Sequence, residues 1–155
     1  MVKNYNGVQI NQSVTIVEQA GAKIADVRNR IVKFDDNGFV VLATAGTDIP
    51  VGVAIIEAGY NDVTGMESGK VESGDNVDIV IKDMTVVLAG ATIKKGQEIT
   101  AGENGFAVPA ASGNYVLGFA MDNAEAEEYL SIQIAKYQKS GSSAASDEVE
   151  SGEEA

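Results

Sequence analysis

Short apolar segments alternate with turn-forming residues along most of the chain, and this pattern predicts an all-β protein. The segments are rich in Val, Ile and other β-branched residues and are bounded by Gly, Asn, Asp or Pro, which is typical of strands. Their regular spacing favours a sandwich or barrel of antiparallel strands. One helical turn is expected at residues 123–128. The predicted strands are residues 13–18, 31–34, 39–43, 51–56, 76–82, 84–89, 98–101, 106–110, 115–121 and 129–136, with a shorter extended piece at 22–25.

One segment of this pattern occurs twice. The sequence NGFVVLATAGTDIPVGVA at residues 37–54 returns as NGFAVPAASGNYVLGFA at residues 104–120. Both copies run from an Asn-Gly-Phe turn through a small-residue segment to a glycine within an apolar run, which is Gly52 or Gly118. The offset is 67 residues at the turn and 66 at these glycines, so one deletion explains the difference. A ligand-binding loop need not recur in this way, and we interpret the segment as scaffold of a duplicated unit.

The Asn-Gly pair that opens each copy predicts a tight hairpin. Asn37-Gly38 lies between Phe34 and Phe39, and both turn residues accept the positive φ angles of a two-residue hairpin. The second copy has the sequence ENGF at the same point. We therefore expect two equivalent hairpins, one in each repeat.

The repeat defines the expected domain organisation. We predict one β domain at residues 13–139, a compact antiparallel β-barrel or β-tulip-like sandwich with repeats at about 21–81 and 90–136. The whole chain has 155 residues, which suits a single domain. Residues 1–12 are polar with scattered apolar positions and form either a docking arm or a frayed terminus with an edge strand. Residues 140–155 are acidic with one apolar residue larger than Ala, so a disordered tail is expected.

Charge narrows the range of partners. The formal net charge is −12, but five of the 23 acidic residues lie in the tail, so the remainder carries 18 acids against 11 bases, a net of −7. An acidic body argues against binding nucleic acid or an anionic membrane. No apolar run is long enough to cross a bilayer, and the N-terminus lacks a signal-peptide core. We expect a protein that is made in the cytoplasm.

The chain also lacks Cys and His, which removes the thiol nucleophile, the commonest general base and the commonest metal ligand. The acidic pairs Asp35-Asp36 and Glu127-Glu128 are better explained as solvated turn residues than as catalytic carboxylates. We therefore expect no catalytic residues, no cofactor and no metal. An enzyme that uses carboxylates alone is a disfavoured alternative.

The duplicated sequences carry a family resemblance. The segments DDNGFVVLATAGTDIPVGVAI and GENGFAVPAASGNYVLGFAM, separated by a stretch containing VDIVIKDMTVVLAGATIKKG, resemble the small capsid-cement or head-decoration proteins of tailed bacteriophages. The likeness covers roughly residues 14–136. It implies an all-β protein, without catalytic residues, on the outer surface of the assembled virion head. There it would bridge neighbouring major capsid protein subunits and stabilise the capsid, and contacts between copies would make a homotrimer natural at a threefold position.

Contacts with the capsid are expected in the parts of the chain that do not repeat. These are the arm, the loop at residues 59–72 and the basic window at residues 23–33, because apolar arms, loops on a β scaffold and basic patches in an acidic protein suit partner binding. Tyr115 and Tyr137 also suit an interface, although a single Tyr is more often a packing residue. The candidate contact residues are Tyr5, Val8, Ile10, Arg28, Arg30, Tyr60 and Met66.

A second class of function fits the same sequence. A β-rich adhesion or glycan-binding module, displayed on a virion or cell surface, would also have a stable β scaffold and no reactive groups. Binding to empty expanded capsids or to a polysaccharide array would distinguish the two classes.

Overall fold

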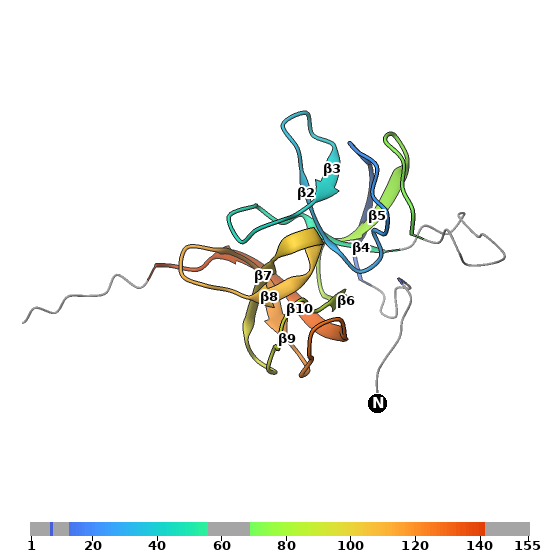
Figure 1. The fold of residues 1–155 in the computed structure, drawn as a ribbon. Helices are drawn as coiled ribbons and strands as arrows, with labels where there is room; N and C mark the ends of the chain where they lie inside the picture. The colour runs from blue at the N-terminus through green and yellow to red at the C-terminus, as the bar shows by residue number, and fades with distance from the viewer. Residues whose placement is uncertain (1–6, 8–12, 56–68, 142–155) are drawn as a thin grey trace, which may run out of the picture.

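The structure, a computed structural model, describes residue 7 and residues 13–55 and 69–141. Within these residues the protein is all-β, with a single 3₁₀ turn, η1 (Glu103–Gly105) (Figure 1). All ten predicted strands are present, with ends within two residues of those expected. They are β1 (Thr15–Gln19), β2 (Ile31–Phe34), β3 (Val40–Leu42), β4 (Gly52–Ile55), β5 (Asn76–Val80), β6 (Met84–Leu88), β7 (Glu98–Ala101), β8 (Ala107–Pro109), β9 (Tyr115–Ala120) and β10 (Tyr129–Gln138).

The strands form two antiparallel five-stranded sheets with the same strand order. The first sheet runs β1-β5-β4-β2-β3 and the second runs β6-β10-β9-β7-β8. Each strand of the first sheet therefore has a counterpart at the same place in the second. Figure 1 shows the first sheet above the second. The sequence repeat is thus the repeat of a complete sheet, and it includes β1 and β6, which precede the segments that resemble each other most.

Each sheet curls until its two edge strands meet at one residue pair. An isolated parallel bridge joins Ala20 to Val40 in the first sheet and Ala89 to Ala107 in the second. One bridged pair does not make a continuous ladder, so neither sheet is closed into a barrel. The barrel alternative is therefore wrong, and the arrangement is consistent with the predicted sandwich.

The glycines shared by the two copies lie where neighbouring backbones touch. A Cβ atom on Gly52 would collide with the carbonyl oxygen of Val80, and one on Gly118 would collide with that of Gln133. Any side chain here would push β4 away from β5 or β9 away from β10, which is why a strand interior keeps a residue that otherwise weakens it. The scaffold interpretation of the repeated segment is confirmed at these positions.

Both predicted hairpin turns are present, but each is five residues long. In the first, Gly38 has a φ of 83°, and the Asp35 carboxylate accepts hydrogen bonds from the backbone N–H groups of Asn37 and Phe39, both at 2.9 Å. In the second, Asn104 and the following glycine both have positive φ. In the first hairpin the Asp35 side chain stabilises an Asx-type turn, whereas the second has Gly102 at that position and is closed by backbone hydrogen bonds alone.

The helical turn expected at residues 123–128 is absent. These residues form a turn instead, in which Ala124 makes an isolated antiparallel bridge with Ile93. An equivalent antiparallel bridge joins Ile24 to Val71 in the first repeat. Pairing with a distant segment has overridden the weak helical propensity of this short stretch.

The buried side chains form two clusters, one centred on each sheet. The first includes Val32, Val40 and Ile79. The second contains the apolar side chains of β6 to β10 together with Ile31 and Val53 from the first sheet. Because these two residues belong to the core of the other repeat, the two sheets are packed against each other and are not independent units.

Asn29 joins the repeats at the edge of the second sheet. Its side-chain amide donates to the Val86 carbonyl oxygen at 2.8 Å, and the Leu88 N–H donates to its backbone oxygen at 3.0 Å. Asn29 is buried and has a φ of 57°. The equivalent residue of the second repeat is Gly96, with a φ of 90°. Asn29 thus has a left-handed backbone conformation at a position where the second repeat has Gly. Its side chain also forms a hydrogen bond to β6.

Candidate interaction surfaces

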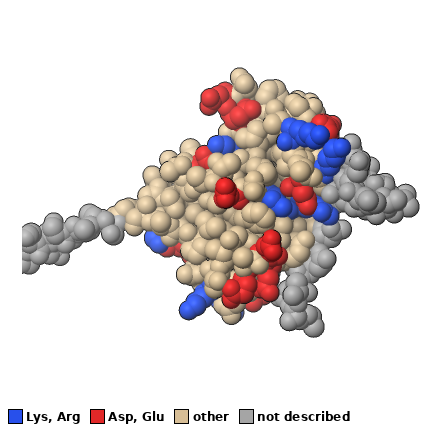
Figure 2. Space-filling model, in the orientation of Figure 1, with Lys and Arg blue, Asp and Glu red and all other residues tan. Residues whose placement is uncertain are grey.

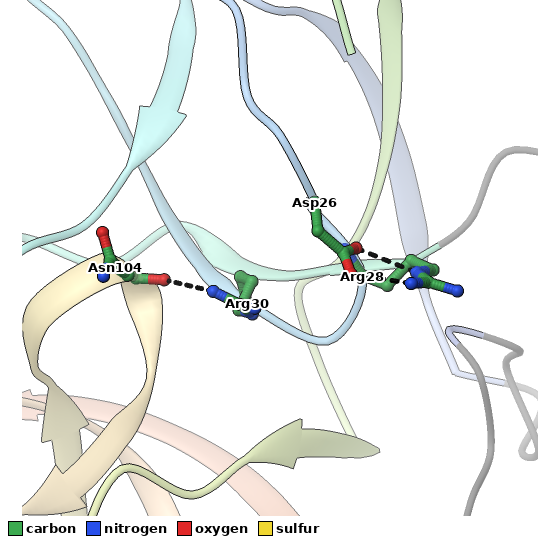
Figure 3. A network of polar contacts seen from close by, with 4 residues as sticks. All are labelled: Asp26, Arg28, Arg30 and Asn104. Atoms are coloured by element: carbon green, nitrogen blue, oxygen red, sulfur yellow. Dashed lines mark hydrogen bonds and ion pairs between the residues drawn. The ribbon is translucent and has the colours of Figure 1, made fainter. Parts of the chain in front are cut away.

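Arg28, one of the two predicted contact arginines, is held by its own chain. Its guanidinium makes two hydrogen bonds to the Asp26 carboxylate, at 2.8 and 2.7 Å, and its backbone N–H makes a third at 3.0 Å (Figure 3). The hydrogen bond to Asp26 raises the pKa of Arg28. Burial raises the pKa of Asp26, but the hydrogen bonds and the charge of Arg28 outweigh it, so the net pKa is below the ordinary value. Such a bidentate pair holds the guanidinium in one orientation.

Two glycines pack against this pair. Gly7 is buried with a φ of 79°, and a Cβ atom there would lie 2.8 Å from the Arg28 Cγ atom. A Cβ atom on Gly69 would lie 2.7 Å from the Arg28 Nε atom. The Arg28 stem therefore supports the backbone at Gly7, within the predicted N-terminal arm. The structure gives Arg28 an internal role, and its contact with a partner stays a prediction.

Arg30, the second predicted contact arginine, connects the first repeat to the hairpin turn of the second. Its Cζ atom lies 4.2 Å from the centre of the Phe106 ring, a stacking distance for a cation–π contact. Its Nη1 atom donates to the Asn104 carbonyl oxygen at 3.1 Å (Figure 3). The Arg30 Nε atom is buried without a hydrogen-bond partner, and burial lowers the pKa of Arg30. The side chain thus serves as a contact between repeats, a role that the sequence pattern did not predict.

The other cations of the basic window also have acidic neighbours. Lys33 Nζ lies 2.7 Å from the Asp48 carboxylate, while Lys23 lies 3.9 Å from Glu72 with both side chains at least half exposed. Figure 2 shows basic side chains next to acidic ones on the right of the face drawn, and acidic groups without basic neighbours at its top and bottom, with wide uncharged areas between them. Three of the four cations in the window thus lie in local ion pairs, and the fourth, Arg30, stacks on Phe106. Of the two lysines, Lys23 is the more accessible.

An apolar groove lies where the loop before β4 meets the ends of β9 and β10. It has a volume of about 340 Å³ and is lined by side chains that include Ile49, Pro50, Tyr115 and Tyr137. Ile49 is 65% exposed and Tyr137 is 39% exposed. Lys136 also lines the groove, but its Nζ atom donates to a backbone oxygen of the neighbouring loop at 2.7 Å, and burial lowers its pKa. Aromatic rings next to exposed apolar side chains suit contact with a protein or with a sugar ring.

A polar contact fixes one wall of this groove. The Tyr137 hydroxyl donates a hydrogen bond to the Glu98 carboxylate, which also lies 3.0 Å from Lys139 Nζ. Desolvation and this hydrogen bond raise the pKa of Tyr137 to about 12. The Tyr137 ring lies 6.0 Å from that of Phe119. Two contacts therefore hold the exposed Tyr137 ring in place, the Phe119 ring and the hydrogen bond from its hydroxyl to Glu98.

Five of the predicted contact residues lie outside the described residues. They are Tyr5, Val8, Ile10, Tyr60 and Met66. The structure places Arg28 against Gly7 of the predicted arm. It places Arg30 at the junction of the two repeats. The groove and the junction residue Asn29 were not predicted. Alignment of the repeats would have signalled Asn29, since Asn opposite Gly marks a left-handed position.

Neither a metal centre nor a membrane helix is found in the described part of the chain. Within residues 13–55 and 69–141, no three Asp or Glu side chains gather closely enough to hold a metal ion. No helix in these ranges has the length and apolar character needed to span a bilayer. What the described surface offers is a set of apolar and aromatic contacts on a rigid β scaffold.

Comparison with known proteins shows a similarity to one protein family and to a solved phage structure. The sequence model of a family described as XM1 gp53 minor capsid protein matches residues 3–134. The crystal structure of the head fiber gp8.5 N base in bacteriophage phi29 aligns with a TM-score of 0.58 and 24% sequence identity, covering 80% of this chain and 95% of that chain. At this identity the structural match shows a shared fold alone. No curated protein matches the chain.

Proposed function

Because this chain belongs to the XM1 gp53 minor capsid protein family, we propose that it is a decoration protein that binds the outer surface of the phage head and bridges neighbouring major capsid protein subunits. Family membership makes it a capsid-associated structural protein of the virion. The observation that carries the proposal is the match over residues 3–134, which includes the first sheet and all of the second except the last four residues of β10.

The surface described above suits repeated attachment. A capsid presents many symmetry-related copies of one site, so a protein that contacts two or three subunits gains affinity from effective concentration even when each contact is weak. Ile49 and Tyr137 at the groove supply exposed apolar contacts. The two sheets share core residues, so the body would join those subunits as one packed unit. Contacts between copies at a threefold position would produce a homotrimer.

The N-terminal arm is proposed as the main capsid contact. Gly7 is buried against Arg28, so the arm has an attachment point on the body. Removing residues 1–12 would also remove this internal contact and would confuse stability with binding. Substituting the apolar contact candidates Tyr5, Val8 and Ile10 with Ser, while Gly7 is kept, avoids that problem.

Cosedimentation with empty expanded heads of the phage tests the proposal. We expect the full chain to bind saturably and to raise the temperature at which the heads dissociate. The triple Ser variant should bind at least about tenfold more weakly, since about 1.4 kcal/mol of lost contact corresponds to a factor of ten. Its melting temperature as a free protein should match that of the wild type.

Two results would contradict this proposal. Heads that do not retain the wild-type chain would exclude a decoration role. Heads that retain the chain but dissociate at an unchanged temperature would exclude bridging while leaving attachment intact. If the triple Ser variant binds like the wild type, the arm is not the contact, and the loop at residues 59–72 becomes the next segment to substitute.

The groove gives one specific reason to keep a second candidate function. Tyr115, Tyr137 and Lys136 line it together, and aromatic rings with nearby hydrogen-bond donors are a common arrangement for sugar rings. A glycan array therefore belongs beside the head-binding assay. Binding to a glycan that is lost on substituting Tyr115, with no binding to heads, would favour the adhesion function.

A further inference from the structure

We infer that the β2–β3 hairpin is a docking site for an arginine side chain from a different protein, which stacks on the ring of Phe39. The inference comes from comparing this hairpin with its counterpart between β7 and β8. The second hairpin already holds an arginine within the chain, whereas the first has none. The inference rests on the proposed function only in naming the source of the arginine, which would be the capsid subunit to which this chain attaches.

The two hairpins occupy equivalent places in their repeats, although Asp35 of the first is replaced by Gly102 in the second. Each has an Asn-Gly-Phe sequence at its tip and a five-residue turn. A backbone hydrogen bond closes each turn at 2.7 Å, from Asp35 to Phe39 in the first and from Gly102 to Phe106 in the second. The rings therefore leave their sheets at the same place. The turns differ in one backbone angle, since Asn104 has a positive φ.

In the second hairpin, the site is filled. The Arg30 guanidinium lies 4.2 Å from the centre of the Phe106 ring. A Cβ atom on Gly105 would lie 2.7 Å from the carbonyl oxygen of Ile31, and Gly105 is buried. The turn therefore meets a strand end that supplies both an arginine and a backbone surface. This is the contact that joins the two repeats at this point.

In the first hairpin, the same surface is open. Phe39 is 41% exposed, and a Cβ atom on Gly38 would meet no other atom within 4 Å. Figure 1 shows this hairpin projecting from the top of the molecule. Within the described residues, the first hairpin therefore lacks the neighbour that Arg30 and Ile31 provide to the second.

The chemistry of the tip favours an arginine as the occupant. Asp35 and Asp36 lie beside Phe39 in the turn, and the nearest cation on the strand, Lys33, is paired with Asp48 at 2.7 Å. A guanidinium can stack on an aromatic ring while its N–H groups face a carboxylate. An ammonium group is more strongly hydrated and stacks less well. The acidic residues therefore add charge complementarity to the geometry of the ring.

A second copy of this chain cannot supply the arginine. The whole sequence contains two arginines, Arg28 and Arg30. Arg28 is bound to Asp26 at 2.7 Å, and Arg30 is stacked on Phe106. Either would have to break an internal contact in order to dock elsewhere. The occupant is therefore an arginine of another protein.

Binding of the full chain to empty expanded heads, measured for two matched variants, tests the inference. Phe39→Ala should weaken binding by about 3- to 30-fold, the range expected for one cation–π contact. The control is Phe34→Ala, because Phe34 is 43% exposed on the same hairpin but pairs with the buried Val40 and faces the other side. It should change binding by less than about twofold, within the scatter of a neutral surface contact.

A second measurement covers the case in which heads do not bind the wild-type chain. The labelled full chain is titrated with a short peptide containing one arginine and, separately, with the same peptide containing lysine, and the amide shifts are followed by NMR. The arginine peptide should shift residues 35–39 more than the lysine peptide does, and Phe39→Ala should abolish the difference.

The outcomes separate the two proposals. If heads bind the wild type, the two variants test the docking site. The docking site is overturned if Phe39→Ala binds as tightly as the wild type, or if Phe34→Ala loses as much affinity as Phe39→Ala. Either result leaves the decoration role standing. If heads do not bind the wild type, the decoration role fails and the titration decides, with identical shifts for the two peptides overturning the docking site.

Discussion

Asn29 provides the sharpest test of how the two repeats are joined. Substituting it with Gly keeps the left-handed backbone, since Gly96 occupies the same position of the second repeat at a φ of 90°. The substitution removes only the side-chain amide that donates to the Val86 oxygen at 2.8 Å. The backbone N–H and C=O groups of residues 86 and 88 in β6 point away from β10 and toward Asn29. This is because successive residues of a strand direct these groups to opposite sides.

The expected cost follows from this local geometry. Leaving the carbonyl of the buried Val86 without a partner costs about 1–3 kcal/mol, while the entropy that Gly adds to the unfolded chain is offset because Gly adopts the left-handed conformation without strain. Removal of the Asn29 Oδ1 atom, which is buried without a partner, offsets part of this. We expect Asn29→Gly to lower the free energy of unfolding by about 2 kcal/mol, or the melting temperature by about 6–10 °C. Asn29→Ala should lose about 1 kcal/mol more, because Ala disfavours the left-handed region.

Urea unfolding followed by circular dichroism measures these changes on the free protein. Hydrogen exchange adds a local readout, since the Leu88 amide donates to the Asn29 oxygen and should exchange faster in both variants. The matched control is Gly96→Asn. A Cβ atom there would meet no other atom within 4 Å, and Asn tolerates positive φ, so stability should change by less than about 1 kcal/mol.

The reasoning would be refuted by a particular pattern of results. An Asn29→Gly variant within about 0.3 kcal/mol of the wild type would mean that the amide contributes nothing net to stability, near the additivity error of such measurements. A control that loses as much as Asn29→Gly would mean that the backbone conformation, and not the side-chain contact, determines the cost.

Three further changes test the contacts described above. Phe106→Leu keeps apolar area but removes the ring beneath Arg30, so urea unfolding should show a loss of about 1 kcal/mol; no loss would contradict the stacking contact. The pKa of Tyr137 is raised to about 12, so the stability that this group contributes is complete below its ordinary pKa of 10.0 and is lost as pH rises through about 12. Absorbance titration should show this late ionisation, and Glu98→Gln should bring it earlier; an unchanged titration would contradict the hydrogen bond. Gly118→Ala should destabilise by at least about 3 kcal/mol in thermal unfolding because the backbones of β9 and β10 must separate; a stable variant would show that they can.

The sequence predicted the strands well because each is encoded locally. β-branched runs between Gly, Asn and Asp define ten strands whose ends agree with the structure to within two residues. The Asn-Gly-Phe repeat also predicted two equivalent hairpins. The helical turn at residues 123–128 failed because Ala124 pairs with Ile93, a contact 31 residues away that no local propensity encodes.

The candidate site was harder to predict because charge in a sequence does not say which charges pair. Arg28 and Arg30 were selected as contacts from a basic window. Folding brings Asp26 onto Arg28 through a local turn, and it brings Phe106 onto Arg30 from 76 residues away. The groove at Ile49 and Tyr137 likewise combines a loop of one repeat with two strand ends of the other.

By itself, then, the sequence determined the strands, the duplication and the absence of Cys and His, since these depend on residue type and order. Only the tertiary structure decided how the copies differ. Two like hairpins have unlike surroundings, because the fold places Arg30 over Phe106 and leaves Phe39 exposed. The physical reason is that two units joined end to end can satisfy one such surface internally, and the other remains available to a partner.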